Sequence, residues 1–168
     1  MYRWLKATLV ATAVTLAAIQ IIRPSRTNPP EETGRSIHAA GASIDPAVGS
    51  VLKRSCNDCH SNSTVWPWYS HVAPVSWLVA ADVYRGRRAL NLSEWGGYTP
   101  QQRTALLHDM CEEVRQGEMP GALYAAMHGQ ARMSNAERQH FCDWVHQAAG
   151  DAARTEPYRG KAALMEDN

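Results

Sequence analysis

The sequence predicts an all-α fold, and three observations support this prediction. Apolar residues recur at spacings of three and four along several stretches of the 168-residue chain. Residues that favour the N-terminus of a helix precede these stretches at Asp45, Thr99 and Ser134, and glycines follow two of them at Gly117 and Gly150. No segment alternates apolar and polar residues over enough positions to form a strand. We therefore expect one helical domain with short flanking segments.

Residues 1–23 are predicted to form a membrane anchor. Arg3 and Lys6 precede an uncharged run over residues 7–22, and Arg23 follows it. Sixteen helical residues span roughly 24 Å, less than a hydrocarbon core of ~30 Å, but the flanking Lys6 and Arg23 side chains can reach the headgroups. A cleaved signal peptide is the alternative, although no small-x-small site follows the run directly. Both interpretations predict an exported chain.

The segments on either side of the domain are predicted from their composition. Residues 24–43 contain three prolines and little apolar periodicity, so we expect a linker that holds the domain away from the membrane. Residues 151–168 are polar and are expected to form a mobile tail. The folded domain is therefore assigned to residues 44–150, where helices are predicted over 46–56, 75–84, 100–116 and 135–149.

Cys56, Cys59 and His60 form a Cys-x-x-Cys-His motif, for which three chemistries compete. A structural zinc site needs four ligands, and the other two cysteines, Cys111 and Cys142, are single and far apart. A thiol oxidoreductase usually carries Cys-x-x-Cys after a strand, whereas here a predicted helix precedes it. Covalent haem attachment accounts for every residue of the motif, because each thiol can add to one vinyl group and the adjacent histidine can coordinate iron.

A second axial ligand to iron is sought among the methionines and histidines. Met119 lies just past the predicted helix end at Gly117, and Pro120 stiffens the backbone beside it. His71 and His128 are the alternatives, and an open sixth position is the third possibility.

Tryptophan is unusually frequent, with six tryptophans against one phenylalanine. Trp66, Trp68, Trp77 and Trp95 fall within one short stretch, which fits either a tryptophan-rich core or a pocket for a bulky flat ligand.

The stretches "IQIIRPSRTNPP", "CNDCHSNSTVWPWYSHVAPVSWLVAADVYRGRRALNLSEW", "GEMP" and "MSNAERQHFCDW" together resemble the bacterial haem-binding domain family of membrane-anchored, single-haem c-type cytochromes. The similarity runs from the end of the apolar run to about Trp144. It implies a cytochrome c-like helical domain in which Cys56, Cys59 and His60 hold one haem c. It also implies that Met119 occupies the distal position.

The resemblance gives roles to further side chains. It implies that Trp66, Trp68, Tyr69 and Trp77 form the wall and lid of the haem pocket. Arg87 is a candidate partner for a haem propionate, because a guanidinium suits bidentate contact with a carboxylate. A solvated arginine at a helix end is the alternative.

Cys111 and Cys142 are predicted to form a disulfide, because an even cysteine count in an exported chain favours pairing. The bond would join the helix before Met119 to the C-terminal helix and contribute about 3 kcal/mol. Two buried free thiols are the alternative.

These features predict a membrane-tethered electron carrier of the bacterial inner membrane. Its haem domain would face the periplasm and exchange electrons with periplasmic or membrane redox proteins. A haem-based sensor or peroxidase with a labile sixth ligand is the first alternative, and a thiol oxidoreductase using Cys56 and Cys59 is the second. We see no acid–base set near the motif and do not expect an enzyme. The net charge of +1, without a run of basic residues, excludes an electrostatic footprint for nucleic acid.

Overall fold

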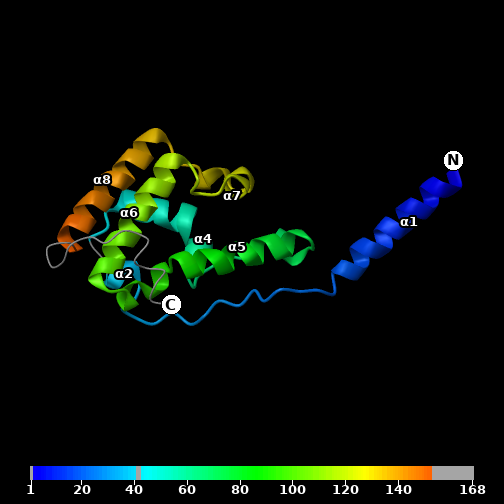
Figure 1. Ribbon diagram of the computed structural model, residues 1–168, viewed down its shortest axis with the longest axis horizontal. Helices are drawn as coiled ribbons and strands as arrows, with labels where there is room; N and C mark the ends of the chain where they lie inside the picture. Colours follow the sequence, from blue (N-terminus) through cyan, green and yellow to red (C-terminus); the bar gives the residue numbers. More distant parts are fainter. Residues whose placement is uncertain (1, 41–42, 153–168) are drawn as a thin grey trace.

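The computed structural model describes residues 2–40 and 43–152, and within them all regular elements are helices (Figure 1). The all-α prediction is confirmed. In chain order the elements are α1 (Tyr2–Ile19), α2 (Ile37–Ala40), α3 (Pro46–Val51), the π-helical turn η1 (Leu52–Cys56), α4 (Asn57–His60), the 3₁₀ turn η2 (Trp68–His71), α5 (Val75–Ala89), the 3₁₀ turn η3 (Leu92–Gly97), α6 (Pro100–Gln116), α7 (Ala122–Met127), the 3₁₀ turn η4 (Gly129–Ala131) and α8 (Asn135–Ala152).

Local capping interactions place the helix ends close to where the sequence predicts them. Asp45 caps α3 by accepting hydrogen bonds from two backbone N–H groups. Thr99 and Gln102 form a reciprocal capping box at the start of α6. Gly117 ends α6 with a φ of 77°, a left-handed conformation that glycine adopts without strain. The helix predicted over 75–84 extends further, to Ala89.

The hydrophobic core forms where α8 packs against α6 and α3. A disulfide joins Cys111 of α6 to Cys142 of α8, with Cα atoms 5.1 Å apart. This bond matches the pairing predicted from the cysteine count, and both half-cystines are buried. The largest fully buried apolar side chains lie in this core and beside it, at Phe141, Ile37, Leu52, Val48 and Val145.

Helix α1 extends away from the rest of the chain and has no buried residue (Figure 1). Among the residues that the structure describes, no helix combines the length and apolarity needed to cross a membrane. The predicted transmembrane helix at residues 1–23 is therefore not supported. The physical reason is that α1 includes the charged Arg3 and Lys6 and ends at Ile19, so it contains only part of the apolar run.

The segment predicted as a linker, residues 24–43, is packed against the domain over much of its length. We call residues 20–35 the strap, which runs alongside α5 in Figure 1. The Gln20 side chain exchanges two hydrogen bonds with the Ala73 backbone, donating from Nε2 at 3.1 Å and accepting at Oε1 at 2.9 Å. Further along, Asn28 donates to the Thr64 carbonyl at 2.9 Å. The strap therefore positions α1 relative to the domain.

The far end of the strap is fastened to η3. Glu31 accepts hydrogen bonds from the hydroxyls of Ser63 at 2.6 Å and Ser93 at 2.7 Å. Arg35 pairs with Glu94 at 2.9 Å, and its carbonyl accepts a hydrogen bond from the Gly96 backbone. Residues 41–42 of the predicted linker lie outside the described residues, as does all of the predicted tail (151–168) beyond Ala152.

Candidate functional site

The Cys-x-x-Cys-His motif lies on a continuous helical segment that runs from α3 through η1 into α4. Cys56 is the last residue of the π-helical turn, and Cys59 and His60 end α4. The helical backbone places residues three apart on the same face, so the two cysteines can reach one side of the segment together. Both are free thiols, whereas Cys111 and Cys142 are bonded to each other.

The His60 imidazole is oriented by a backbone carbonyl. Its Nδ1 lies 3.2 Å from the Leu90 carbonyl oxygen, which can only accept, so the hydrogen bond requires the proton on Nδ1. Nε2 then carries the lone pair that a metal ion needs. Burial lowers the pKa of His60, although the Leu90 and Gly86 carbonyls act in the opposite direction, so the ring is neutral at pH 7.

Gly86 allows α5 to pack directly on the motif. A Cβ atom at this position would lie 2.5 Å from the Cys59 carbonyl oxygen, so no larger residue fits without moving the backbone. Gly86 is not among the site residues predicted from the sequence. It lies beyond the helix predicted over 75–84 and inside α5 as observed, so the sequence pattern gave no signal for this close approach.

The two thiols are held in their protonated form. Burial raises the pKa of Cys56 to about 12 and that of Cys59 to about 11, and the Asp58 carboxylate adds to the effect on Cys59. Catalytic and redox-active cysteines instead have lowered pKa values, because the thiolate is the nucleophile. The direction of these shifts is opposite to the one that activates the cysteines of thiol oxidoreductases.

The structure gives no support to a structural zinc site. Across residues 2–40 and 43–152, no group of three or more His, Cys, Asp and Glu side chains is arranged to hold a metal ion. A structural zinc ion takes four such ligands.

Met119 lies in the short loop between α6 and α7. The backbone N–H groups of Glu118 and Met119 both donate to the Glu113 carbonyl, which fastens the start of the loop to the end of α6. The Met119 side chain is 41% exposed. Its thioether is thus accessible from outside the protein core.

The two alternative histidine ligands differ in their surroundings. His71 is exposed at the end of η2. His128 is half-buried, and its Nε2 lies 3.2 Å from the Tyr69 hydroxyl. Its ring stacks on Tyr124 with centroids 4.2 Å apart, so His128 already has aromatic and hydrogen-bonding partners.

The aromatic residues predicted as pocket wall and lid are not gathered in one cluster. The indole N–H groups of Trp66 and Trp77 donate to the strap, at Asn28 Oδ1 (3.2 Å) and the Ile22 carbonyl (2.8 Å). Trp68 is 77% exposed, with its ring edge on Tyr69. The fourth clustered tryptophan, Trp95, is in the core.

The Arg87 guanidinium is surrounded by protein acceptors. It donates to the Ser61 carbonyl at 2.8 Å, the Thr27 carbonyl at 3.2 Å and the Thr64 hydroxyl at 2.8 Å, and also to Asn28 Oδ1 at 2.8 Å. These contacts join α5, the strap and the loop after the motif. In this structure the Arg87 guanidinium donates its hydrogen bonds to oxygen atoms of the protein. Its pairing with a haem propionate therefore stays a prediction.

Exposed apolar side chains lie on the two segments that flank the motif. One segment is η2 with α5, which packs on α4, and the other is α7, which contacts α4 through Tyr124. Their exposed large apolar residues are Trp68, Val72, Val75, Leu78, Leu123 and Met127, together with Met119 in the loop before α7. An exposed apolar surface next to the Cys-x-x-Cys-His motif suits the binding of a flat hydrophobic cofactor.

A comparison with protein families gives one match. Residues 14–147 match the family described as Haem-binding domain, and this range covers most of the chain and all the candidate site residues. The chain belongs to this family. The resemblance noted from the motifs is therefore confirmed at the level of the family. No curated protein and no solved structure matches the chain.

The donor set of this haem-binding domain fits the cofactor that the family name implies. Two protonated thiols on one helical segment can add to the two vinyl groups of one porphyrin, and a neutral imidazole with its Nε2 lone pair can bind iron. Met119 offers a soft thioether ligand in the adjacent loop. Cys56, Cys59, His60 and Met119 are therefore the residues that could hold haem.

Proposed function

We propose that the protein is a c-type cytochrome that carries one covalent haem for electron transfer. Cys56 and Cys59 would form the thioether bonds, and His60 would be the proximal ligand. The observation that carries this proposal is the His60 ring beside two free thiols, with Nδ1 tied to the Leu90 carbonyl and Nε2 left to coordinate.

The addition of the two cysteines to haem conserves atoms and electrons, so it needs no oxidant or reductant. Each cysteine S–H adds across one vinyl C=C bond, so that sulfur bonds to one carbon and hydrogen to the other. Both cysteines are free in this structure, so both sulfurs are available for the addition. The bound haem iron would supply one-electron exchange between its ferrous and ferric states.

Met119 is the second axial ligand in this proposal. A thioether favours ferrous iron and raises the reduction potential, as suits a carrier whose ligands stay bound during electron transfer. Its loop is fastened to α6 by the bonds to the Glu113 carbonyl, which supports a fixed position for the sulfur.

A haem-based sensor or peroxidase is the second candidate, and one observation favours it. The Met119 side chain is exposed and α7, which follows its loop, has no buried residue, so the sixth position could open. Carbon monoxide separates the two functions. The ferrous protein should resist carbon monoxide if Met119 binds firmly, and should bind it at once if the position is open.

The test of covalent attachment uses the full chain produced together with haem-maturation machinery. After acid extraction and denaturation, the mass of the parent polypeptide should include one haem. The variant Cys56→Ala/Cys59→Ala should lose it. The Cys111→Ser/Cys142→Ser variant, which also removes two cysteines, is the matched control and should keep it. A parent polypeptide without tetrapyrrole would remove this proposal.

We further propose that the haem domain works in the bacterial periplasm, beside the inner membrane, and passes electrons to redox proteins there. The Cys111–Cys142 disulfide supports an oxidising compartment. The exposed apolar residues of α1, among them Leu9 and Val14, support association with lipid. Fractionation tests this location: the parent should pellet with membranes, and a variant lacking residues 2–19 should not. Equal distribution of the two would contradict the role of α1.

A further inference from the structure

Helix α7 is held in place without a contribution from the hydrophobic core. Its six residues, Ala122–Met127, include none that is buried, and Leu123 and Met127 are more than half exposed. Apolar packing, which stabilises most helices in proteins, therefore does not fix its position. Other contacts must hold it against the domain.

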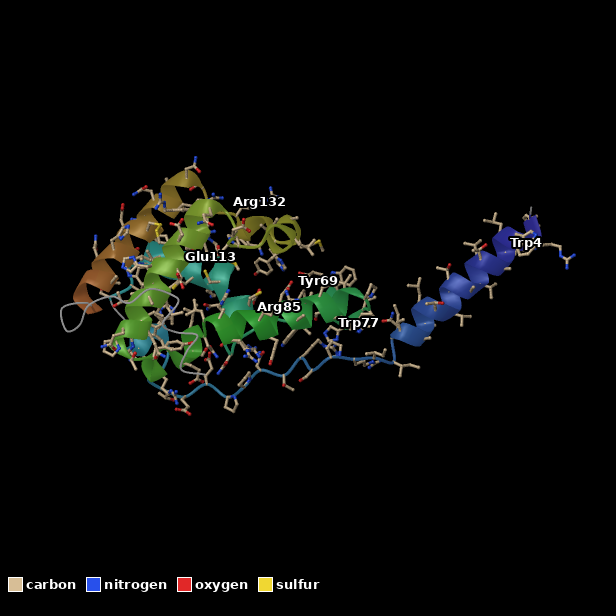
Figure 2. The ribbon with its side chains drawn as sticks, viewed as in Figure 1. Trp4, Tyr69, Trp77, Arg85, Glu113 and Arg132 are labelled. Carbon is tan, nitrogen blue, oxygen red and sulfur yellow. A yellow bond between two sulfur atoms is a disulfide. The ribbon has the colours of Figure 1, made fainter. Side chains whose placement is uncertain are left out.

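Both ends of the segment around α7 are anchored. At the start, the Glu118 and Met119 backbone N–H groups donate to the Glu113 carbonyl. At the end, the Ser55 hydroxyl donates to the Ala131 carbonyl at 2.9 Å, and Arg54 donates to the Gln130 carbonyl at 2.9 Å. Figure 2 shows Glu113 and Arg132 near these two ends.

Between the anchors, a polar network connects α7 to the cysteine motif. The Tyr124 hydroxyl donates to Asp58 Oδ2 at 2.7 Å, a short bond to an ionised acceptor. Asp58 is the residue directly before Cys59 and is itself fixed, because its Oδ1 accepts from the Val65 N–H at 3.0 Å. The bond therefore ties the middle of α7 to α4.

The same tyrosine is supported from the opposite side. Its ring stacks on His128, and the His128 ring nitrogens lie 3.2 Å and 3.5 Å from the Tyr69 hydroxyl. Tyr69 belongs to η2, and Figure 2 shows it between α5 and α7. Tyr124 thus contacts α4 directly through Asp58, and it contacts η2 indirectly through His128.

We propose that Tyr124 is a positioning residue for Met119. Its hydrogen bond to Asp58 fastens α7, and with it the loop that carries Met119, to the segment that bears Cys56, Cys59 and His60. This inference rests on the proposed function and deepens it, because it states which contact fixes the position of the distal ligand Met119. The bonds to the Glu113 carbonyl fix only the backbone of Met119, so the direction of its side chain depends on the segment that follows. Without the Tyr124 bond, that segment can move between its two anchors.

The variant Tyr124→Phe tests the proposal, because it removes one oxygen and keeps the ring that stacks on His128. Tyr84→Phe is the matched control, since the Tyr84 hydroxyl lies on the exposed side of α5 and accepts only from Arg88 among the hydrogen bonds of this structure's described residues. Met119→Ala provides the reference for a haem without the thioether ligand.

The first measurement uses the full chain without haem. Hydrogen exchange is followed at the α7 amides, such as the Ala125 and His128 N–H groups, which donate to Gly121 and Tyr124 carbonyls. Tyr124→Phe should speed their exchange about tenfold relative to the parent, a change equivalent to about 1.4 kcal/mol. The amides of α6 should exchange as in the parent, and so should all amides of Tyr84→Phe.

The second measurement uses the haem-loaded full chain. Tyr124→Phe should keep the covalent haem, yet its ferrous form should bind carbon monoxide about tenfold faster than the parent and its reduction potential should fall towards that of Met119→Ala. Tyr84→Phe should match the parent in both properties.

Three results would overturn the inference. The first is parent-like exchange of α7 in Tyr124→Phe, which would mean that the bond does not fasten the helix. The second is faster exchange with parent-like carbon monoxide binding and potential, which would mean that α7 does not position the ligand. The third is a Met119→Ala spectrum identical to that of the parent. In each case covalent haem in the parent would leave the proposed c-type cytochrome standing, although the third result would remove Met119 as its ligand. Absence of covalent haem would remove that function independently of the exchange result.

Discussion

Gly86 determines how closely α5 approaches the cysteine motif. An alanine in the interior of a helix normally adds about 1 kcal/mol of stability relative to glycine. At Gly86 the added Cβ would meet the Cys59 backbone, so the two helices would have to separate. The same geometry holds Cys59 and His60 in their places.

We predict that Gly86→Ala lowers the free energy of unfolding by about 2–3 kcal/mol, because the clash involves backbone atoms that cannot rotate away. Chemical denaturation of the full chain measures the change. Gly49→Ala in α3 is the control, since the nearest atom to its Cβ is 3.7 Å away, and it should be neutral or stabilising. Similar stability of the two variants would contradict the prediction.

Glu137 combines two interactions at the start of α8. Its carboxylate accepts hydrogen bonds from the Ser134 N–H and hydroxyl, both at 2.8 Å, and pairs with Arg54. The Ser134 bonds are the main reason why the pKa of Glu137 is lowered from its ordinary value of 4.5. A carboxyl whose pKa is lower in the folded state stabilises the fold above its unfolded pKa, and this contribution is lost as the pH falls through the folded value.

We predict that Glu137→Ala costs about 1 kcal/mol at neutral pH. The difference from the parent should shrink as the pH is lowered below 4.5, because protonation of Glu137 weakens the same contacts in the parent. Urea unfolding at several pH values measures it. Glu112→Ala on the exposed surface of α6 should stay within about 0.5 kcal/mol. A pH-independent difference for Glu137→Ala would argue against the role of its charge.

Helices α6 and α8 are joined by the Cys111–Cys142 disulfide in addition to their packing. The bond closes a loop with a sequence separation of 31, which restricts the unfolded chain. Neither half-cystine takes part in the donor set of Cys56, Cys59 and His60.

We predict that Cys111→Ser/Cys142→Ser, or a reducing agent acting on the parent, lowers the melting temperature and costs about 3 kcal/mol. The absorption spectrum of the bound haem, recorded with the iron fully reduced in every sample, should stay unchanged in both cases. Thermal unfolding followed by circular dichroism, with the spectrum recorded alongside, measures both effects. A variant that melts with the parent would show that the bond adds no stability.

Helices whose ends are defined by nearby residues were predictable from the sequence. The caps at Asp45 and Thr99 act within three residues along the chain, so their pattern is visible without a fold. The bond from Tyr124 to Asp58 spans 66 residues and depends on tertiary packing. Only the Cys-x-x-Cys-His part of the candidate site has a local pattern, and it was predicted for that reason.

At the scale of the whole molecule, the sequence predicted a domain on a loose linker. In the structure the strap is hydrogen-bonded to the domain and forms a fixed N-terminal extension of it. Its contacts are hydrogen bonds between polar side chains and backbone groups of distant segments, such as Gln20 with Ala73. Proline content and missing apolar periodicity indicate an extended segment correctly but carry no information on such partners. The sequence therefore predicted that this segment is extended, but it did not predict that the segment is hydrogen-bonded to the domain.

We predict that Arg87→Ala releases the middle of the strap and lowers the free energy of unfolding by about 2 kcal/mol, because it removes hydrogen bonds from a charged donor to Thr27 and Asn28. Hydrogen exchange over residues 24–31 should become faster. Arg85→Ala is the control on the same helix, since Arg85 is exposed and pairs only weakly with Asp82, at 3.5 Å. Equal exchange in the two variants would show that Arg87 does not hold the strap.

The course of residues 20–35 bears on how a fragment of this protein should be cut for crystallisation or spectroscopy. A boundary drawn at residue 44, where the compositional pattern of the domain begins, would strip Trp66 and Trp77 of their hydrogen-bond acceptors and leave Arg87 with half of its own. A fragment beginning at Gln20 would keep those partners while omitting the exposed helix.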